Sequence, residues 1–143
     1  MSINETKIVI CPHCQREQSV KIWQSLNVAL DKEVKKELFE GKINLLVCEN
    51  CQQKTFIPVP FLYIDPERQI AVHYFPTAVI RDEKFLQQFN IDGTYAGGES
   101  TGLEVPDYMR YLHIVFNMDE LVTFIVFREV LFDFHRTGKV LLD

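Results

Sequence analysis

All four cysteines of this 143-residue chain fall into two Cys-x-x-Cys pairs, Cys11-Pro12-His13-Cys14 and Cys48-Glu49-Asn50-Cys51. Two residues between paired cysteines is the spacing of a zinc knuckle. Four thiolates placed tetrahedrally at about 2.3 Å from the ion form a closed structural zinc site. We therefore expect one structural Zn²⁺ ion, with the ligands Cys11, Cys14, Cys48 and Cys51.

Disulfide bonds and thiol redox chemistry are the alternatives to zinc. Residues 1–5 have neither the basic start nor the apolar core of a signal peptide, so we expect a cytoplasmic protein with reduced cysteines. The segment from Cys11 to Cys14 also resembles the active site of periplasmic thiol oxidases of thioredoxin fold, where the first cysteine begins a helix. Residues 15–23 have β-favouring apolar residues at 20 and 22 and no helical apolar stripe. This pattern favours a knuckle followed by a strand over a redox site.

Chain length and charge limit the possible partners. With 47% hydrophobic residues, residues 1–143 suit a single domain, with a zinc-knuckle half (1–60) and a half containing a sheet and a C-terminal helix (61–143). The longest uncharged apolar stretch of the C-terminal part, 121–127, is far shorter than the roughly 18 residues of a membrane helix. The formal net charge is −5, whereas nucleic-acid affinity comes mainly from Lys and Arg at phosphates. We expect no membrane and no nucleic-acid binding.

The segment between the two pairs is 33 residues long, which exceeds the roughly 15 to 20 residues of a plain zinc ribbon. A short helix fits into this insertion. Asp31 can cap its first turn, Val34 and Leu38 lie four residues apart, and Gly41 can end it. Residues 43–47 are then predicted to form a strand that leads into Cys48.

A set of these residues resembles the CpXC domain, a bacterial family of uncharacterised function named for paired Cys-Pro-x-Cys motifs. The set comprises Cys11-Pro12-His13-Cys14, Asn27, Leu38, Gly41, Asn44, Cys48-x-x-Cys51 and Leu62-Tyr63-x-Asp65. The resemblance implies metal binding and no particular activity. The chain departs from the pattern at Glu49, where the family has a proline that fixes φ. Gln15 and Gln52 also stand where a glycine commonly follows a zinc knuckle.

The C-terminal half predicts several strands and a long helix. Residues 54–60 suggest an edge strand, and 61–64 and 70–75 flank a turn sequence that predicts a hairpin. Residues 108–116 predict another strand. Asn117, with Glu120 three positions later, can cap a helix that ends at Gly138, although 121–127 taken alone also favours a strand. We expect an α+β fold in which a zinc-ribbon-like two-knuckle element with an inserted short helix joins an antiparallel sheet and a C-terminal helix.

Residues 92–107 contain four of the six glycines and no Lys or Arg, which predicts a flexible connector. The alternative is a lid over a pocket, in an enzyme that uses some of Asp65, His73 and His113. Taken singly, Asp65 is best interpreted as a turn residue, and the two histidines as structural or surface residues. The loop has no phosphate-binding motif, and Ser100 lacks the surroundings of a nucleophile elbow.

The C-terminal helix has an unusually wide apolar arc. At 100° per residue its polar face is narrow, with Glu129, Asp133 and Arg136; one apolar side has Phe124, Phe127, Leu131 and Phe134, and the other has Leu121, Ile125 and Phe132. A helix on one sheet needs a stripe of about 100°, and this arc is about twice as wide. We expect one side to pack on the domain's own sheet and the other to bind a protein partner, most simply the same helix of a second copy. Ile125 and Phe132 are the predicted contact positions of such a dimer.

The sequence therefore predicts a zinc-stabilised cytoplasmic protein-interaction module. Two alternatives stay open at this point: an enzyme with a pocket under the loop 92–107, and a thiol redox protein that uses Cys11 and Cys14.

Overall fold

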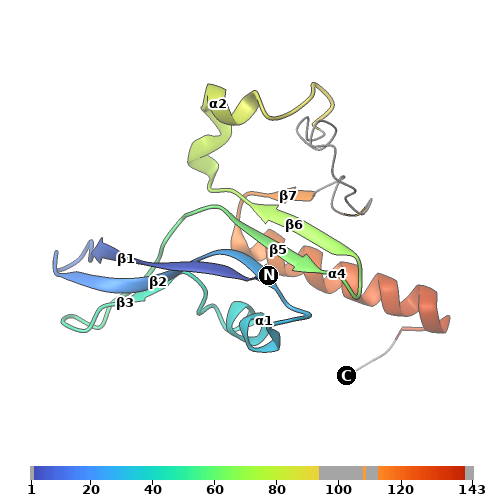
Figure 1. The fold of residues 1–143 in the computed structure, drawn as a ribbon, viewed down its shortest axis with the longest axis horizontal. Helices are drawn as coiled ribbons and strands as arrows, with labels where there is room; N and C mark the ends of the chain where they lie inside the picture. The colour runs from blue at the N-terminus through green and yellow to red at the C-terminus, as the bar shows by residue number, and fades with distance from the viewer. Residues whose placement is uncertain (1, 94–107, 109–112, 141–143) are drawn as a thin grey trace.

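The computed structural model describes residues 2–93, 108 and 113–140. Its strands form a five-stranded sheet of order β1-β2-β5-β6-β7 and a two-stranded sheet of β3 and β4. The helix α4 lies along one face of the larger sheet (Figure 1). In chain order the elements are β1 (Ile3–Ile10), β2 (Glu17–Asn27), α1 (Lys32–Phe39), β3 (Leu45–Val47), β4 (Lys54–Phe56), β5 (Phe61–Asp65), β6 (Ile70–Tyr74), the 3-10 helix η1 (Thr77–Arg81), α2 (Glu83–Leu86), β7 (His113–Val115) and α4 (Met118–Thr137).

The helices and strands confirm the prediction of an α+β fold. The prediction of an antiparallel sheet is wrong, because the larger sheet is mixed. β1 pairs with β2 and β5 with β6 in antiparallel fashion, but β2–β5 and β6–β7 are parallel pairs. A parallel pair needs a long crossover between its strands. The segment with α1, β3 and β4 supplies that crossover between β2 and β5. The sequence prediction relied on turn sequences, which identify only antiparallel strands that follow each other along the chain.

The predicted hairpin of β5 and β6 is confirmed, and Asp65 occupies its turn. The Asp65 carboxylate accepts hydrogen bonds from the backbone amides of Glu67, at 3.1 Å, and Arg68, at 3.3 Å. This is an Asx turn, the local arrangement that favours aspartate at such positions. The predicted edge strand at 54–60 is shorter than expected, since β4 covers only Lys54–Phe56 and pairs with β3. β1 was not predicted.

The main core lies between the sheet and the two longer helices. The inserted helix is confirmed as α1: it buries Val34 and Leu38, and Gly41 follows it at φ +75°. Asp31 occupies the N-cap position, but its side chain makes no capping hydrogen bond. Apolar side chains of α1 and α4 pack with those of β2, β5 and β6 in a single cluster.

The predicted C-terminal helix is also confirmed, and residues 121–127 are helical. The Asn117 side chain accepts a 2.8 Å hydrogen bond from the Glu120 amide. Gly138 has a φ of +81° and donates its amide to the Phe134 carbonyl at 2.7 Å, which ends the helix. Of the predicted strand 108–116, His113–Val115 is extended as β7, Tyr108 is helical, and 109–112 lie outside the described residues.

The structure decides which side of α4 is buried. Leu121 and Ile125 are 0% exposed and belong to the core, whereas Phe127 on the other side is 58% exposed. Ile125 is therefore wrong as a predicted contact position, because α4 uses that side to cover its own sheet. The polar face meets protein as well: Glu129 pairs with Lys35 of α1 and lies 3.7 Å from Arg68 of the β5–β6 turn.

Candidate metal centre

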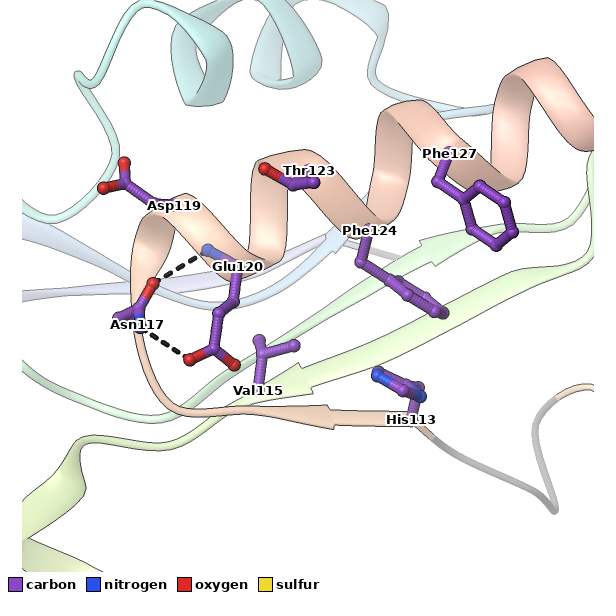
Figure 2. A pocket seen from close by; sticks show the side chains of 8 residues that line it. All are labelled: His113, Val115, Asn117, Asp119, Glu120, Thr123, Phe124 and Phe127. Atoms are coloured by element: carbon purple, nitrogen blue, oxygen red, sulfur yellow. Dashed lines mark hydrogen bonds between the residues drawn. The ribbon is translucent and has the colours of Figure 1, made fainter.

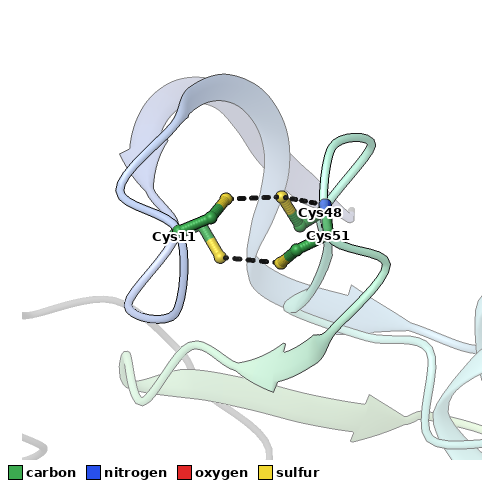
Figure 3. A group of neighbouring side chains, drawn as sticks. Cys11, Cys48 and Cys51 are labelled. Carbon is green, nitrogen blue, oxygen red and sulfur yellow. Dashed lines mark hydrogen bonds between the residues drawn. The ribbon is translucent and has the colours of Figure 1, made fainter.

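Each Cys-x-x-Cys pair lies in the turn of a β-hairpin, and the two turns face each other (Figure 3). The first turn joins β1 and β2, and the second joins β3 and β4. The sulfur atoms of all four cysteines lie within 4.8 Å of one another. The contacts between the two pairs are short, with 3.4 Å for Cys14–Cys48 and 3.6 Å for Cys11–Cys51.

These sulfur positions fit a tetrahedral ion. A tetrahedron with metal–sulfur bonds of about 2.3 Å has edges of about 3.8 Å, which lies within the observed range. All four cysteines are free of disulfide bonds, and sulfur contacts of 3.4 and 3.6 Å join one knuckle to the other. The four-cysteine cluster could hold a metal ion at the junction of the two hairpins.

The two knuckles have the same backbone geometry, although only the first contains proline. In each, the amide after the second cysteine bonds to the carbonyl of the first: Gln15 to Cys11 at 2.8 Å, and Gln52 to Cys48 at 2.9 Å. Gln15 and Gln52 have φ of +64° and +63°, the left-handed region in which glycine is unstrained. The absent glycines therefore add backbone strain but do not change the turn. Glu49, which replaces proline, leaves it unchanged as well.

Two amide side chains attach the second hairpin to β2. Buried Asn44 accepts a 2.7 Å hydrogen bond from the Trp23 amide and donates a 3.1 Å bond to the Trp23 carbonyl. Gln18 donates to the Val47 carbonyl at 2.9 Å and accepts from the Glu49 amide at 3.1 Å. These bonds hold the second hairpin, which carries Cys48 and Cys51, against β2, which follows the first knuckle. Asn44 stood out in the sequence only through the family resemblance, and Gln18 was missed because its partner lies 29 residues away.

An apolar cluster surrounds the sulfur atoms. Cys11 and Cys48 are buried together with Val20, Ile22 and Leu46, and Val9, Ile57 and Val59 pack against them. Burial limits the access of water and reagents to Cys11 and Cys48, whereas Cys14 and Cys51 are partly exposed. The cluster joins β1 and β2 to β3, so the cysteines sit at the point where the two sheets meet.

The local hydrogen bonds favour thiolates at the first knuckle. The Cys14 backbone amide is the main cause of a lowered pKa for Cys11. A hydrogen bond from the Asn50 side chain, helped by the Arg16 amide, lowers the pKa of Cys14 to about 6. At Cys51 the Gln53 amide acts in the same direction, but burial and the neighbouring sulfurs outweigh it and raise the pKa to about 12. Four thiolates so close together therefore need a cation to balance their charge.

The residues of the enzyme alternative do not form one site. Directly paired residues of neighbouring strands share a sheet face. The pairings Val72–His113 and His73–Ile114 therefore put the two histidines on opposite faces. Asp65 shares the face of His113, because Tyr63 on its strand pairs with Val72. Asp65 is 2% exposed, and its carboxylate accepts the hydrogen bonds of the turn amides.

Both histidines stack on phenylalanines instead. The His73 ring lies 4.1 Å from that of Phe75, and burial lowers its pKa to about 4. The His113 ring is parallel to that of Phe124 at 4.0 Å, and burial is the main cause of its lowered pKa, followed by the charge of Arg128. Both histidines thus have the structural surroundings that the sequence suggested.

An open hollow of about 640 Å³ lies between β7 and the first half of α4 (Figure 2). His113 and Phe124 stack at one end, and Asn117 and Glu120 bond to each other at the other end, where they cap the helix. These polar groups are occupied by structural contacts. The predicted loop 92–107 lies outside the described residues from 94 onward, so a pocket beneath it lies outside them as well.

The fold and the site together define an α+β protein with a four-cysteine cluster that could hold a metal ion. The family described as CpXC protein matches residues 9–130, a range that contains both cysteine pairs and most of α4. The chain belongs to the CpXC family, and the resemblance drawn from its sequence is confirmed. No curated protein and no solved structure matches the chain. Among the described residues, no helix has the length and apolar character needed to cross a membrane.

Proposed function

We propose that this chain is a protein-interaction module whose two hairpins are joined by one structural Zn²⁺ ion at Cys11, Cys14, Cys48 and Cys51. The observation that carries the proposal is the convergence of four sulfur atoms within 4.8 Å, contributed by two hairpin turns. A set of four thiolates suits zinc and not the hard cations Mg²⁺ or Ca²⁺. Zn²⁺ with four protein ligands has no open coordination position, so its contribution is structural.

The surroundings of Cys11 favour this proposal over a thiol redox role. A redox cysteine attacks from an accessible position, commonly at a helix N-terminus. Cys11 is 0% exposed, and strand β2 follows the first knuckle. Cys14 is partly exposed, so a protein that cycled between Cys11 and Cys14 would need the buried Cys11 to become accessible.

The exposed side of α4 supports the interaction role. Val126, Phe127, Val130 and Phe134 are exposed and follow one another along the helix. Their spacing of one, four and eight residues from Val126 places them in one stripe. Neighbouring apolar side chains exposed on one face typically mark a protein contact. We name these four residues the outer stripe and propose it as the contact surface for a protein partner. Association with the same helix of a second copy stays a prediction.

The zinc proposal is tested by elemental analysis of the purified full chain. We expect about one zinc per chain, because four thiolates complete one tetrahedral site. Cys48→Ser removes one ligand and is expected to lower the zinc content severalfold. His13→Ala is the matched control: His13 is exposed in the same knuckle, so its loss is expected to leave the content unchanged. A metal-free wild type with a reversible Cys11–Cys14 disulfide would instead support the redox alternative.

A further inference from the structure

The strand β1 forms an edge of the five-stranded sheet and pairs with β2 alone among the described strands. It is eight residues long, and seven of these residues are exposed, with Ile8 at 71%. Long exposed edges are sites where another strand can add to a sheet, and proteins usually shorten or cover them. This edge is therefore a candidate interaction surface, separate from the metal centre and from the outer stripe.

The hydrogen-bond pattern of β1 shows which of its backbone groups face outward. The Cys11 amide bonds to the Arg16 carbonyl at 3.0 Å, and the register pairs Val9 with Gln18 and Lys7 with Val20. Hydrogen-bonded and non-bonded pairs alternate in an antiparallel ladder. The odd-numbered residues therefore bond to β2, and the amide and carbonyl groups of Asn4, Thr6, Ile8 and Ile10 point away from it. The ladder's irregularity skips Gln24 of β2 and leaves β1 continuous.

The side chains on one face of β1 are complementary to those of a second, antiparallel copy. In an alignment centred on Thr6, Glu5 stands opposite Lys7 of the other copy, and Ile3 stands opposite Val9. Each pairing occurs twice by symmetry, so all four residues of this strand face have a matching partner, and Glu5 and Lys7, which lie 3.1 Å apart within one chain, join a cluster of four alternating charges. Opposite charges and apolar pairs across strands are stabilising, and like charges are destabilising. Centring the alignment one residue away, on Glu5 or Lys7, puts two like charges opposite each other. Centring it on Asn4 or Ile8 places the charged residues opposite apolar ones, so the alignment about Thr6 is the one with matched pairs.

We propose that β1 is a homodimerisation strand, through which two copies pair antiparallel about Thr6 and join their five-stranded sheets into one. The contact is isologous and closes after two copies. It goes beyond the proposed function, because it assigns self-association to β1 in place of the predicted contact between two α4 helices and leaves the outer stripe to a different protein. A strand pair of this length buries less surface than a standard interface, so we expect a dissociation constant in the micromolar range.

The charge pairs provide the main test, by sedimentation equilibrium of the zinc-loaded full chain. Glu5→Lys and Lys7→Glu each place like charges opposite each other twice, and we expect each to weaken the dimer at least about tenfold. The double variant Glu5→Lys, Lys7→Glu restores both pairs and is expected to return the wild-type constant. Lys21→Glu is the matched control, since Lys21 is exposed on the neighbouring strand β2 and the charge change equals that of Lys7→Glu.

Thr6→Pro tests the backbone contact separately. Proline removes an amide that faces away from β2, so the variant is expected to keep the β1–β2 ladder and its melting temperature but to be monomeric. The proposal is overturned by a wild type that is monomeric up to about 200 µM, a concentration well above the micromolar constant expected. It is also overturned if the double variant fails to dimerise, or if Phe127→Glu dissociates the dimer while the β1 variants do not. That last result would assign self-association to α4.

Discussion

Replacing Asn44 is expected to loosen the attachment of the second hairpin to the main sheet. Asn44 is 1% exposed and makes both of its side-chain hydrogen bonds to the backbone of Trp23. Asn44→Ala removes both bonds, at a net cost of about 1 kcal/mol each. The residue also has a φ of +53°, a conformation that asparagine tolerates better than alanine and that adds about 1 kcal/mol. We expect the free energy of unfolding to fall by about 3 kcal/mol.

The variant Asn44→Gly separates the two contributions. It loses the same hydrogen bonds, but glycine has no strain at positive φ, so we expect a loss of about 2 kcal/mol. Trp23 is the single tryptophan of the chain and the partner of these bonds, so its fluorescence in a urea titration of the zinc-loaded protein reports the transition directly. Equal losses for the two variants would refute the strain term. A loss below about 1 kcal/mol for Asn44→Ala would refute the role of the hydrogen bonds.

Three further predictions concern the knuckles, a buried histidine and the two sides of α4. Gln15→Gly and Gln52→Gly relieve strain at φ +64° and +63°. In a urea titration, each is expected to raise the free energy of unfolding by up to about 1 kcal/mol. A lower free energy of unfolding for both variants would contradict the strain. Because burial lowers the pKa of His73 to about 4, its contribution to stability is complete above about pH 6.5 and is lost as the pH falls towards 4, by at most about 3 kcal/mol. His73→Phe should flatten this part of the stability profile relative to wild type, and identical profiles would show that His73 does not cause the slope. Ile125→Glu places a charge at a fully buried position and is expected to unfold the chain. Phe127 is 58% exposed, so Phe127→Glu is expected to change the free energy of unfolding by only about 0.5 kcal/mol. The reverse order in circular dichroism melts would show that the sides of α4 were assigned wrongly.

Local patterns in the sequence predicted the parts of this protein whose interactions join residues a few positions apart. The four cysteines followed from ligand spacing, the β5–β6 hairpin from its turn residues, and α4 from Asn117 and Gly138 at its ends. Each of these features depends on hydrogen bonds or ligand spacing within about one turn of chain. The CpXC resemblance rested on the same short motifs and is matched over residues 9–130.

Only the tertiary structure decided how these parts meet. The parallel pairs β2–β5 and β6–β7 depend on where long connections return the chain, which no turn sequence records. The opposite orientations of His73 and His113 follow from that register. An apolar arc as wide as that of α4 can bury either side, and packing on the sheet selected Leu121 and Ile125. The edge position of β1 was decided in the same way, because a strand becomes an edge only through the order in which the others pair.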